Sequence, residues 1–331
     1  MQYPDVYYTP EYVKLFEISD CGTSESFHYA SELGEIYYSY ILRPITINAH
    51  KTDYYDIASP YGYGGPVILQ NSGNSPNFLL HAFDEKFVEY CRTHRIVSEF
   101  VRFHPLLNNA EYCSCLYETE KNRQTVAIDL TVGDLMTECF SSKCRNMVRK
   151  ATKNGVTAQF DFDGTTLNDF HRLYTLTMRK NVAPNYYFFT EIYFAETMQV
   201  LKGKIFILNA LYEGKIVSAA MFMHHNNFMH YHFSATHPDY YKLACNNLIL
   251  SEAAHWGQAH GKQIFHLGGG FTTADDDPLF VFKKSFAQNG LRDFWIGHRI
   301  HDKNIYQELV ELAQKEKTGS LKTDFFPLYR A

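Results

Sequence analysis

The residues best suited to chemistry lie between Phe228 and Phe286. Three glycines, Gly268-Gly269-Gly270, end an apolar segment, and the string Phe282-Lys283-Lys284-Ser285-Phe286 follows soon after. Glycines at the end of a strand let a ligand approach the backbone closely, so Gly269 is a candidate substrate contact. A lysine between two phenylalanines could place positive charge in a partly dry site, where it stabilises a developing anion most strongly. The alternative for Lys283 is a surface position beside a buried helix face.

Polar side chains near the glycine run are candidates for proton transfer. His266 precedes Leu267 and Gly268, and it could act as a base near neutral pH, although a buried strand histidine is an equally good alternative. The acidic string Asp275-Asp276-Asp277 follows the glycines. We take Asp276 as the candidate base of this string, against the alternative of a solvated acidic loop.

Two further histidines, His230 and His232, stand two residues apart in the segment 228–236, which alternates like a strand. Such a pair can bind a metal, but no third ligand accompanies it at a recognisable spacing, so we expect no metal. A polar wall of a substrate groove is the preferred interpretation.

The elements that must position these residues follow one another directly. After the strand at 228–236, Asn246 or Asn247 is a suitable N-cap for a helix that Gly261 ends. A second strand then leads into the glycine run. A helix N-terminus that follows a strand is a ready anion site. We therefore predict that Lys242, Asn246 and Asn247 bind a phosphate of a donor molecule.

The only basic cluster lies in the segment 141–155, which the pattern predicts to be a helix ended by Gly155. Arg145 and Arg149 share one face of it, and Lys150 follows. Arginine forks bind phosphate bidentately, so these three residues are candidate donor contacts. An ordinary solvated face is an equal alternative.

A glycine- and tyrosine-rich loop stands in the first half of the chain. It belongs to the string Asp56-Ile57-Ala58-Ser59-Pro60-Tyr61-Gly62-Tyr63-Gly64-Gly65-Pro66, which follows a strand-like segment ending at Arg43-Pro44. Backbone amides and tyrosine hydroxyls of this loop could hold a polar ligand, with Arg43 supplying a charge. We predict substrate contacts at Arg43, Tyr61, Tyr63 and Gly64, against the alternative of a tight structural turn.

The motifs together resemble the FemAB-like branch of the GNAT acyltransferase superfamily. The order strand, helix, strand ending in a glycine run and Phe-Lys-x-x-Phe is similar to that family, as are the SPYGYGGP string and the ending Phe326-Pro327-Leu328-Tyr329-Arg330. The resemblance implies an α/β (α+β) fold of two tandem GNAT-like domains, each a mixed, mostly antiparallel sheet flanked by helices. We assign residues 1–140 plus 320–331 to the first domain, on the acceptor side. Residues 141–319 form the second, on the donor and catalytic side.

The resemblance also implies roles. By resemblance to Fem-type transferases, the lysine at the place of Lys283 stabilises an oxyanion or binds a phosphate, and Lys284 is a second candidate there for substrate contact. The expected function is an N-acyltransferase that acts by direct attack on an amine of a small-molecule or lipid-linked cell-envelope precursor. Acyl-CoA is the favoured co-substrate, although the segment Tyr240 to Asn246 lacks the glycine loop that ordinary GNAT enzymes place around the CoA pyrophosphate. The alternatives are an aminoacyl-tRNA-dependent Fem-type transferase and a non-catalytic GNAT that binds a nucleotide-sugar or peptide.

Composition excludes several other classes. The 331 residues carry a formal net charge of −5, which argues against DNA as a partner. No apolar run approaches the length of a membrane span and no signal peptide begins the chain, so we expect a cytoplasmic protein without an integral membrane segment. Seven scattered cysteines without a CxxC pair indicate free thiols in a reducing compartment.

Overall fold

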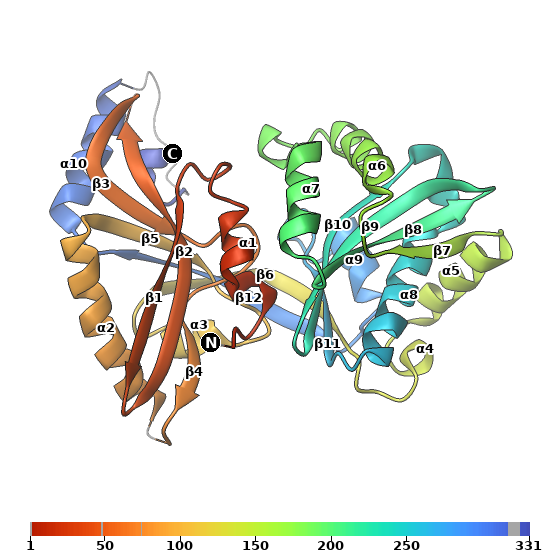
Figure 1. The fold of residues 1–331 in the computed structure, drawn as a ribbon, viewed down its shortest axis with the longest axis horizontal. Helices are drawn as coiled ribbons and strands as arrows, with labels where there is room; N and C mark the ends of the chain where they lie inside the picture. Colours follow the sequence, from red (N-terminus) through yellow and green to blue (C-terminus); the bar gives the residue numbers. More distant parts are fainter. Residues whose placement is uncertain (1, 48, 74, 317–324) are drawn as a thin grey trace. The chain divides into compact units, whose positions relative to one another are not determined.

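A computed structural model of the chain describes residues 2–47, 49–73, 75–316 and 325–331 (Figure 1). The fold is α/β, and the chain divides into two compact units. The first comprises Met1–Tyr3, Tyr7–Asn122 and Asp293–Ala331, and the second Pro4–Val6 and Arg123–Arg292. Each unit contains mostly antiparallel strands with one parallel pair, and helices pack against these strands, which confirms the predicted α/β fold class.

The sheet of the first unit has the strand order β1-β2-β3-β5-β12, and β4 also pairs with β2. Among its described strands, β3 and β5 form the one parallel pair. The strands are β1 (Thr23–Ser31), β2 (Gly34–Ile47), β3 (His50–Ala58), β4 (Val67–Asn71), β5 (Ile96–Arg102) and β12 (Leu291–Ile300). The helices are α1 (Pro10–Lys14), α2 (Pro76–Thr93), α3 (Asn109–Cys113) and α10 (Lys303–Glu316), with the 3-10 helices η1 (Val6–Tyr8) and η4 (Leu328–Arg330) at the ends of the chain.

The strands of the second unit have the order β6-β11-β10-β9-β8-β7, and the pair β10 and β11 is parallel. Its strands are β6 (Glu118–Asp129), β7 (Thr157–Asp161), β8 (Ile205–Tyr212), β9 (Lys215–His225), β10 (Phe228–Thr236) and β11 (Ile264–Gly268). Its helices are α4 (Leu135–Glu138), α5 (Ser142–Lys153), α6 (Leu167–Lys180), α7 (Glu191–Val200), α8 (Cys245–Ala259) and α9 (Pro278–Lys284), with η2 (Asn185–Tyr187) and η3 (Pro238–Leu243) between them.

Helices cover both faces of the second sheet. The helices α6 and α7 pack on one face of β9 and β10, and α8, with α5 behind it, packs on the other (Figure 1). Gly257 allows α8 to lie close to the sheet, because a Cβ there would come 2.9 Å from Leu130 Cδ1 and 3.1 Å from Met229 Sδ. The strands β8 and β9 form a hairpin, as the Glu213-Gly214 pair between two strand-like segments predicts, and both turn residues have positive φ.

A bulge in β10 changes the expected alternation of its side chains. The pairing of β10 with β9 shifts register between Tyr231 and Phe233. Tyr231 therefore packs with Met229 on the α8 side, whereas Phe233 contacts the ring of Phe194 from α7 on the opposite face. The alternation of 228–236 predicts Met229, Tyr231 and Phe233 on one face. This is wrong for Phe233, because an extra residue interrupts the ladder.

The boundaries of the two units differ from those of the predicted domains. The helix α4 lies in the second unit, and α10 lies in the first. The physical reason for α10 is that β12 pairs with β5, which brings the following helix onto Ile45, Ile47 and Val97 of the first unit. Residues 325–331 also lie in the first unit, whereas residues 320–324 of the predicted first domain lie outside the described residues.

Candidate active site

The candidate site of the second unit lies where its two parallel strands stop pairing. The register of β10 and β11 runs from Phe228–Ile264 to His230–His266. Beyond these pairs β10 continues to Thr236 and β11 to Gly268, followed by Gly269 and Gly270. In α/β sheets, ligands bind outside the carboxyl ends of parallel strands. The glycine run therefore stands at the position where a substrate can reach the backbone.

Lys283 of α9 points into this glycine run. Its Nζ donates a hydrogen bond of 2.7 Å to the carbonyl oxygen of Gly269. It also lies 5.6 Å from the centre of the Tyr231 ring, the side chain that follows the last paired residue of β10. Only 7% of Lys283 is exposed. Gly268 has a φ of +75°, and a Cβ there would lie 3.4 Å from the lysine nitrogen, so glycine leaves room for the ammonium group.

Burial has a strong effect on the charge of this lysine. Loss of hydration lowers the pKa of Lys283 to about 7, while Asp277 raises it and Arg123 lowers it further. The side chain therefore titrates near neutral pH. In its protonated form it places a positive charge in a site from which most water is excluded. Such a group can stabilise an oxyanion that develops beside it.

The third aspartate of the acidic string holds the lysine-bearing helix in place. Asp277 is 4% exposed and accepts hydrogen bonds from the amides of Leu279 and Phe280, both at 3.0 Å, as the N-cap of α9. It also accepts from the amide of Thr272 at 2.9 Å. Burial opposes ionisation of Asp277, but hydrogen bonds to Phe280 and Thr272 outweigh it and lower the pKa. Pro278 at the first helical position completes this helix start.

Asp276, the predicted base, is an exposed residue of the turn before that cap, and its role stays a prediction. The sequence Asp277-Pro278 carried the signal for the cap, because an aspartate followed by proline is typical of a helix N-terminus.

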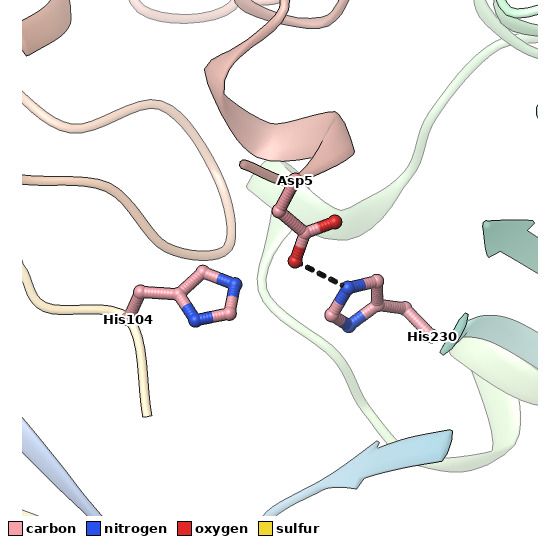
Figure 2. Close-up of side chains that lie close together, drawn as sticks. All are labelled: Asp5, His104 and His230. Atoms are coloured by element: carbon pink, nitrogen blue, oxygen red, sulfur yellow. Dashed lines mark hydrogen bonds and ion pairs between the residues drawn. The ribbon is translucent and has the colours of Figure 1, made fainter. Parts of the chain in front are cut away.

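The histidines of β10 and β11 are buried beside one another. His230 Nε2 lies 2.7 Å from a carboxylate oxygen of Asp5, which the second unit contributes from the N-terminal segment (Figure 2). The rings of His230 and His266 are 5.7 Å apart. Burial lowers the pKa of His232 to about 3, with a smaller effect from His230, so His232 is neutral at ordinary pH. His104, also drawn in Figure 2, belongs to the first unit.

Sequence reasoning missed Asp5 because 225 residues separate it from His230. The predicted roles of His230, His232 and His266 stay predictions, as does the expectation that no metal binds.

The predicted donor contacts at the start of α8 differ in their surroundings. The helix begins at Cys245 after Ala244, whose φ of 61° is left-handed, so the predicted N-cap at Asn246 or Asn247 was wrong. Asn246 instead accepts hydrogen bonds from Ser218 Oγ at 2.9 Å and Thr236 Oγ1 at 3.1 Å. These bonds join the start of α8 to β9 and β10. Asn247 is buried and Lys242 is exposed on η3, and their donor role stays a prediction.

The basic segment forms α5, as predicted, with Ser141 as its N-cap. Arg145 donates to the carbonyl oxygens of Phe140 at 2.7 Å and Met136 at 3.2 Å, so much of its hydrogen-bonding capacity serves the end of α4. Arg149 and Lys150 are exposed on the same helix. Lys284, beside the buried Lys283, is exposed as well.

The predicted substrate residues of the first unit are held by local contacts. Asp56 accepts hydrogen bonds from Arg43 Nε at 2.7 Å, Tyr329 Oη at 3.0 Å and Arg330 Nε at 2.5 Å. The string that begins at Asp56 and the family-like chain end therefore meet at one buried carboxylate. Sequence reasoning missed this contact because 273 residues separate Asp56 from Tyr329. Arg43 uses its Nε here, and its substrate role stays a prediction.

The tyrosine-rich loop is also anchored through its backbone. The carbonyl oxygen of Gly64 accepts from Tyr8 Oη at 2.9 Å and Asn109 Nδ2 at 2.7 Å. The carbonyl oxygen of Tyr61 accepts from Tyr12 Oη at 2.6 Å. The loop is thus a well-fixed platform, while substrate contacts of Tyr61, Tyr63 and Gly64 stay predictions.

Comparison with known proteins adds the family. Residues 140–278 match the acetyltransferase (GNAT) domain. The chain is 26% identical over 206 residues to a UDP-N-acetylmuramoylpentapeptide-lysine N(6)-alanyltransferase of Weissella viridescens, with 59% of each chain covered. The matched part thus spans less than two thirds of that relative.

Solved structures show the same fold. The crystal structure of FemX superposes with a TM-score of 0.72 at 12% identity, covering 92% of this chain and 95% of that one. L-PGS from Bacillus licheniformis gives 0.51 at 16% identity, covering 94% and 98%. A tandem GNAT protein from the clavulanic acid biosynthesis pathway gives 0.50 at 10% identity, covering 85% and 84%.

Within the described part of the chain, none of the helices combines the length and apolar character needed to cross a bilayer.

The matched domain and the shared two-unit architecture agree with the family that the motifs resembled. Residues 140–278 thus match a GNAT acetyltransferase domain, and the chain has the fold of FemX and of a tandem GNAT protein.

Proposed function

We propose that this protein transfers an aminoacyl group from an aminoacyl-tRNA to a side-chain amine of a peptidoglycan precursor. The observation that carries the proposal is the buried Lys283, whose Nζ is hydrogen-bonded to Gly269 where β10 and β11 diverge. This arrangement provides positive charge at a backbone edge that a carbonyl substrate can approach. It suits acyl transfer by direct attack, which needs no covalent intermediate on the protein.

The donor in this proposal differs from the acyl-CoA that the sequence favoured. The Weissella viridescens relative is by its name an alanyltransferase that acts on the lysine N6 of UDP-N-acetylmuramoylpentapeptide. In this chain the start of α8 is formed by η3 and Ala244, without a glycine between Tyr240 and Asn246. These two features support an aminoacyl ester over a CoA thioester, and a muropeptide amine as the acceptor.

The chemistry assigned to Lys283 follows from charge. A neutral amine attacks the carbonyl carbon of the aminoacyl ester, and the carbonyl oxygen becomes negative in the tetrahedral intermediate. The Lys283 ammonium donates a hydrogen bond to that oxygen and stabilises its negative charge. This bond replaces the one to the carbonyl oxygen of Gly269. The bond between the acyl carbon and the ribose oxygen then breaks. The attacking nitrogen loses a proton and the ribose oxygen gains one, which leaves an amide and a free ribose hydroxyl. A cation fixed beforehand in a dry site is worth about 3 kcal/mol in such a step.

The test is a transfer assay with purified protein. tRNA charged with radiolabelled amino acids is incubated with UDP-N-acetylmuramoylpentapeptide that contains lysine, and the product is identified by mass spectrometry. Acetyl-CoA replaces the charged tRNA in a parallel reaction. Aminoacylated pentapeptide is the expected product. If product forms with acetyl-CoA and not with charged tRNA, the donor is acyl-CoA and not aminoacyl-tRNA. If neither donor gives product, the proposal is contradicted.

A further inference from the structure

Helix α5 carries five cationic side chains and no acidic one, in a protein whose formal net charge is −5. Cys144, Val148 and Ala151 form its buried face, in the same core as residues of α8. Lys143, Lys150 and Lys153 lie on the exposed side, with Arg149 beside them. We call the exposed side chains Lys143, Arg149, Lys150 and Lys153 the α5 stripe.

The charges of the α5 stripe are not used inside the protein. Among the described residues, no carboxylate forms an ion pair with any of the four, and Arg149 bonds only to Asn146 Oδ1 of the same helix, at 3.3 Å. Arg145, the fifth cation, differs because it donates to the carbonyl groups at the end of α4. The stripe therefore consists of the four cations that internal structure does not require.

Helix stability explains only part of the stripe. Lysines in the last turn, such as Lys150 and Lys153, interact favourably with the helix dipole. Lys143 stands in the first turn, where the dipole disfavours a cation. The position of Lys143 therefore does not serve the stability of α5.

The length of the stripe indicates which anion. Lys143 and Lys153 are separated by ten positions (153 − 143), or about 15 Å along the axis at the usual rise per residue. A pyrophosphate needs donors that converge on one point, as at a helix N-terminus. A nucleic-acid strand instead presents a phosphate about every 3.4 Å of axis, so that about four phosphates face a stripe of this length.

We infer that the α5 stripe is the docking surface for the RNA backbone of the donor. This inference rests on the proposed function, because it identifies where the RNA part of an aminoacyl donor binds. The contacts are to phosphates and carry no base readout, so binding depends on salt and little on sequence.

The experiment measures RNA binding and transfer separately. A variant with Lys143→Gln, Arg149→Gln, Lys150→Gln and Lys153→Gln is compared with a charge-matched control, Lys51→Gln, Lys86→Gln, Lys303→Gln and Lys315→Gln, whose exposed lysines lie in the first unit. Binding of fluorescently labelled tRNA is measured by anisotropy between 50 and 300 mM NaCl, chosen as roughly the range in which phosphate contacts dominate. We expect the α5 variant to bind about tenfold or more weakly, with a salt slope smaller by about three, and the control to bind like the natural protein.

A second arm separates this inference from the proposed function. Transfer is measured with full-length aminoacyl-tRNA and with an aminoacylated dinucleotide, which is too short to lie along the stripe. The α5 variant should lose transfer from the tRNA and keep transfer from the dinucleotide.

Equal tRNA binding by the α5 variant and the control would overturn the inference. It would also be overturned if the α5 variant lost transfer activity equally with aminoacyl-tRNA and with the aminoacylated dinucleotide. If the natural protein transfers from neither donor, the proposed function fails, while the binding curves still decide whether the stripe holds RNA.

Discussion

The ammonium nitrogen of Lys283 lies 2.7 Å from the carbonyl oxygen of Gly269, in a place where only 7% of the lysine is exposed. A helix side chain and a strand end thereby form a buried polar contact whose acceptor is a neutral carbonyl. Two charged side chains also act on the lysine: Asp277 raises its pKa and Arg123 lowers it. A substrate oxygen can take the place of the carbonyl when it becomes negative.

The first prediction concerns the role of this charge in transfer. Lys283→Met should reduce kcat by about 10²- to 10³-fold, because the oxyanion loses its stabilising cation while the side-chain volume is preserved. The measurement is product formation from aminoacyl-tRNA under saturating acceptor, with folding checked by circular dichroism. Lys215→Met, at an exposed position of the β8–β9 turn in the same unit, is the matched control and should keep full activity. Near-normal turnover of a folded Lys283→Met protein would remove the assigned role.

The second prediction concerns stability and pH. The pKa of Lys283 is lowered by burial from 10.5 to about 7, so between these values the unfolded chain holds a proton that the folded chain has released. The free energy of unfolding contributed by this group therefore rises from pH 7 to about 10.5. Lys283→Met lacks the effect, so we expect the variant to gain stability relative to the natural protein below pH 7 and to lose that advantage toward pH 10.

Urea denaturation at a series of pH values measures this difference directly. Lys215→Met should show no comparable trend, because its side chain is exposed. A stability difference between Lys283→Met and the natural protein that is constant with pH, or that grows as pH rises, would contradict the buried position of the ammonium group.

The third prediction concerns the anchor of α9. Asp277→Ala removes the N-cap bonds to Leu279 and Phe280 and the bond to Thr272. We expect a loss of about 2 kcal/mol in the free energy of unfolding, since N-cap removal alone costs about 1 kcal/mol and a further loop contact is broken. Chemical denaturation gives the value. Asp275→Ala, at an exposed position of the same loop, should change stability by less than about 0.5 kcal/mol, and equal effects of the two substitutions would refute the capping role.

The fourth prediction concerns the first unit. Asp56→Ala leaves Arg43, Tyr329 and Arg330 without their shared acceptor, so stability should fall by about 3 kcal/mol. Because Tyr329 and Arg330 tie the chain end to β3, hydrogen exchange of the amides in 325–331 should accelerate. Asp53→Ala breaks only the exposed ion pair with Arg95 and should have little effect on either measurement. Unchanged exchange at the chain end in Asp56→Ala would show that the carboxylate does not hold it.

Local patterns in the sequence determined the elements and the family. The alternation of 228–236, the Glu213-Gly214 turn and the glycine run correspond to β10, the β8–β9 hairpin and the end of β11. These features depend on backbone conformation and hydrophobic period within a few residues, which a single sequence displays. The Phe-Lys-x-x-Phe string also singled out Lys283 as the lysine of interest.

Tertiary structure decided which polar groups meet. The partners of His230 and Asp56 come from positions 225 and 273 residues away, and no local pattern encodes such pairings. The structure likewise separated the capping Asp277 from the exposed Asp276, and the buried Lys283 from the exposed Lys284, although the neighbours have the same chemistry. Burial and hydrogen-bond partners depend on how distant segments pack, and these set the pKa of Lys283 and the surroundings of every candidate residue.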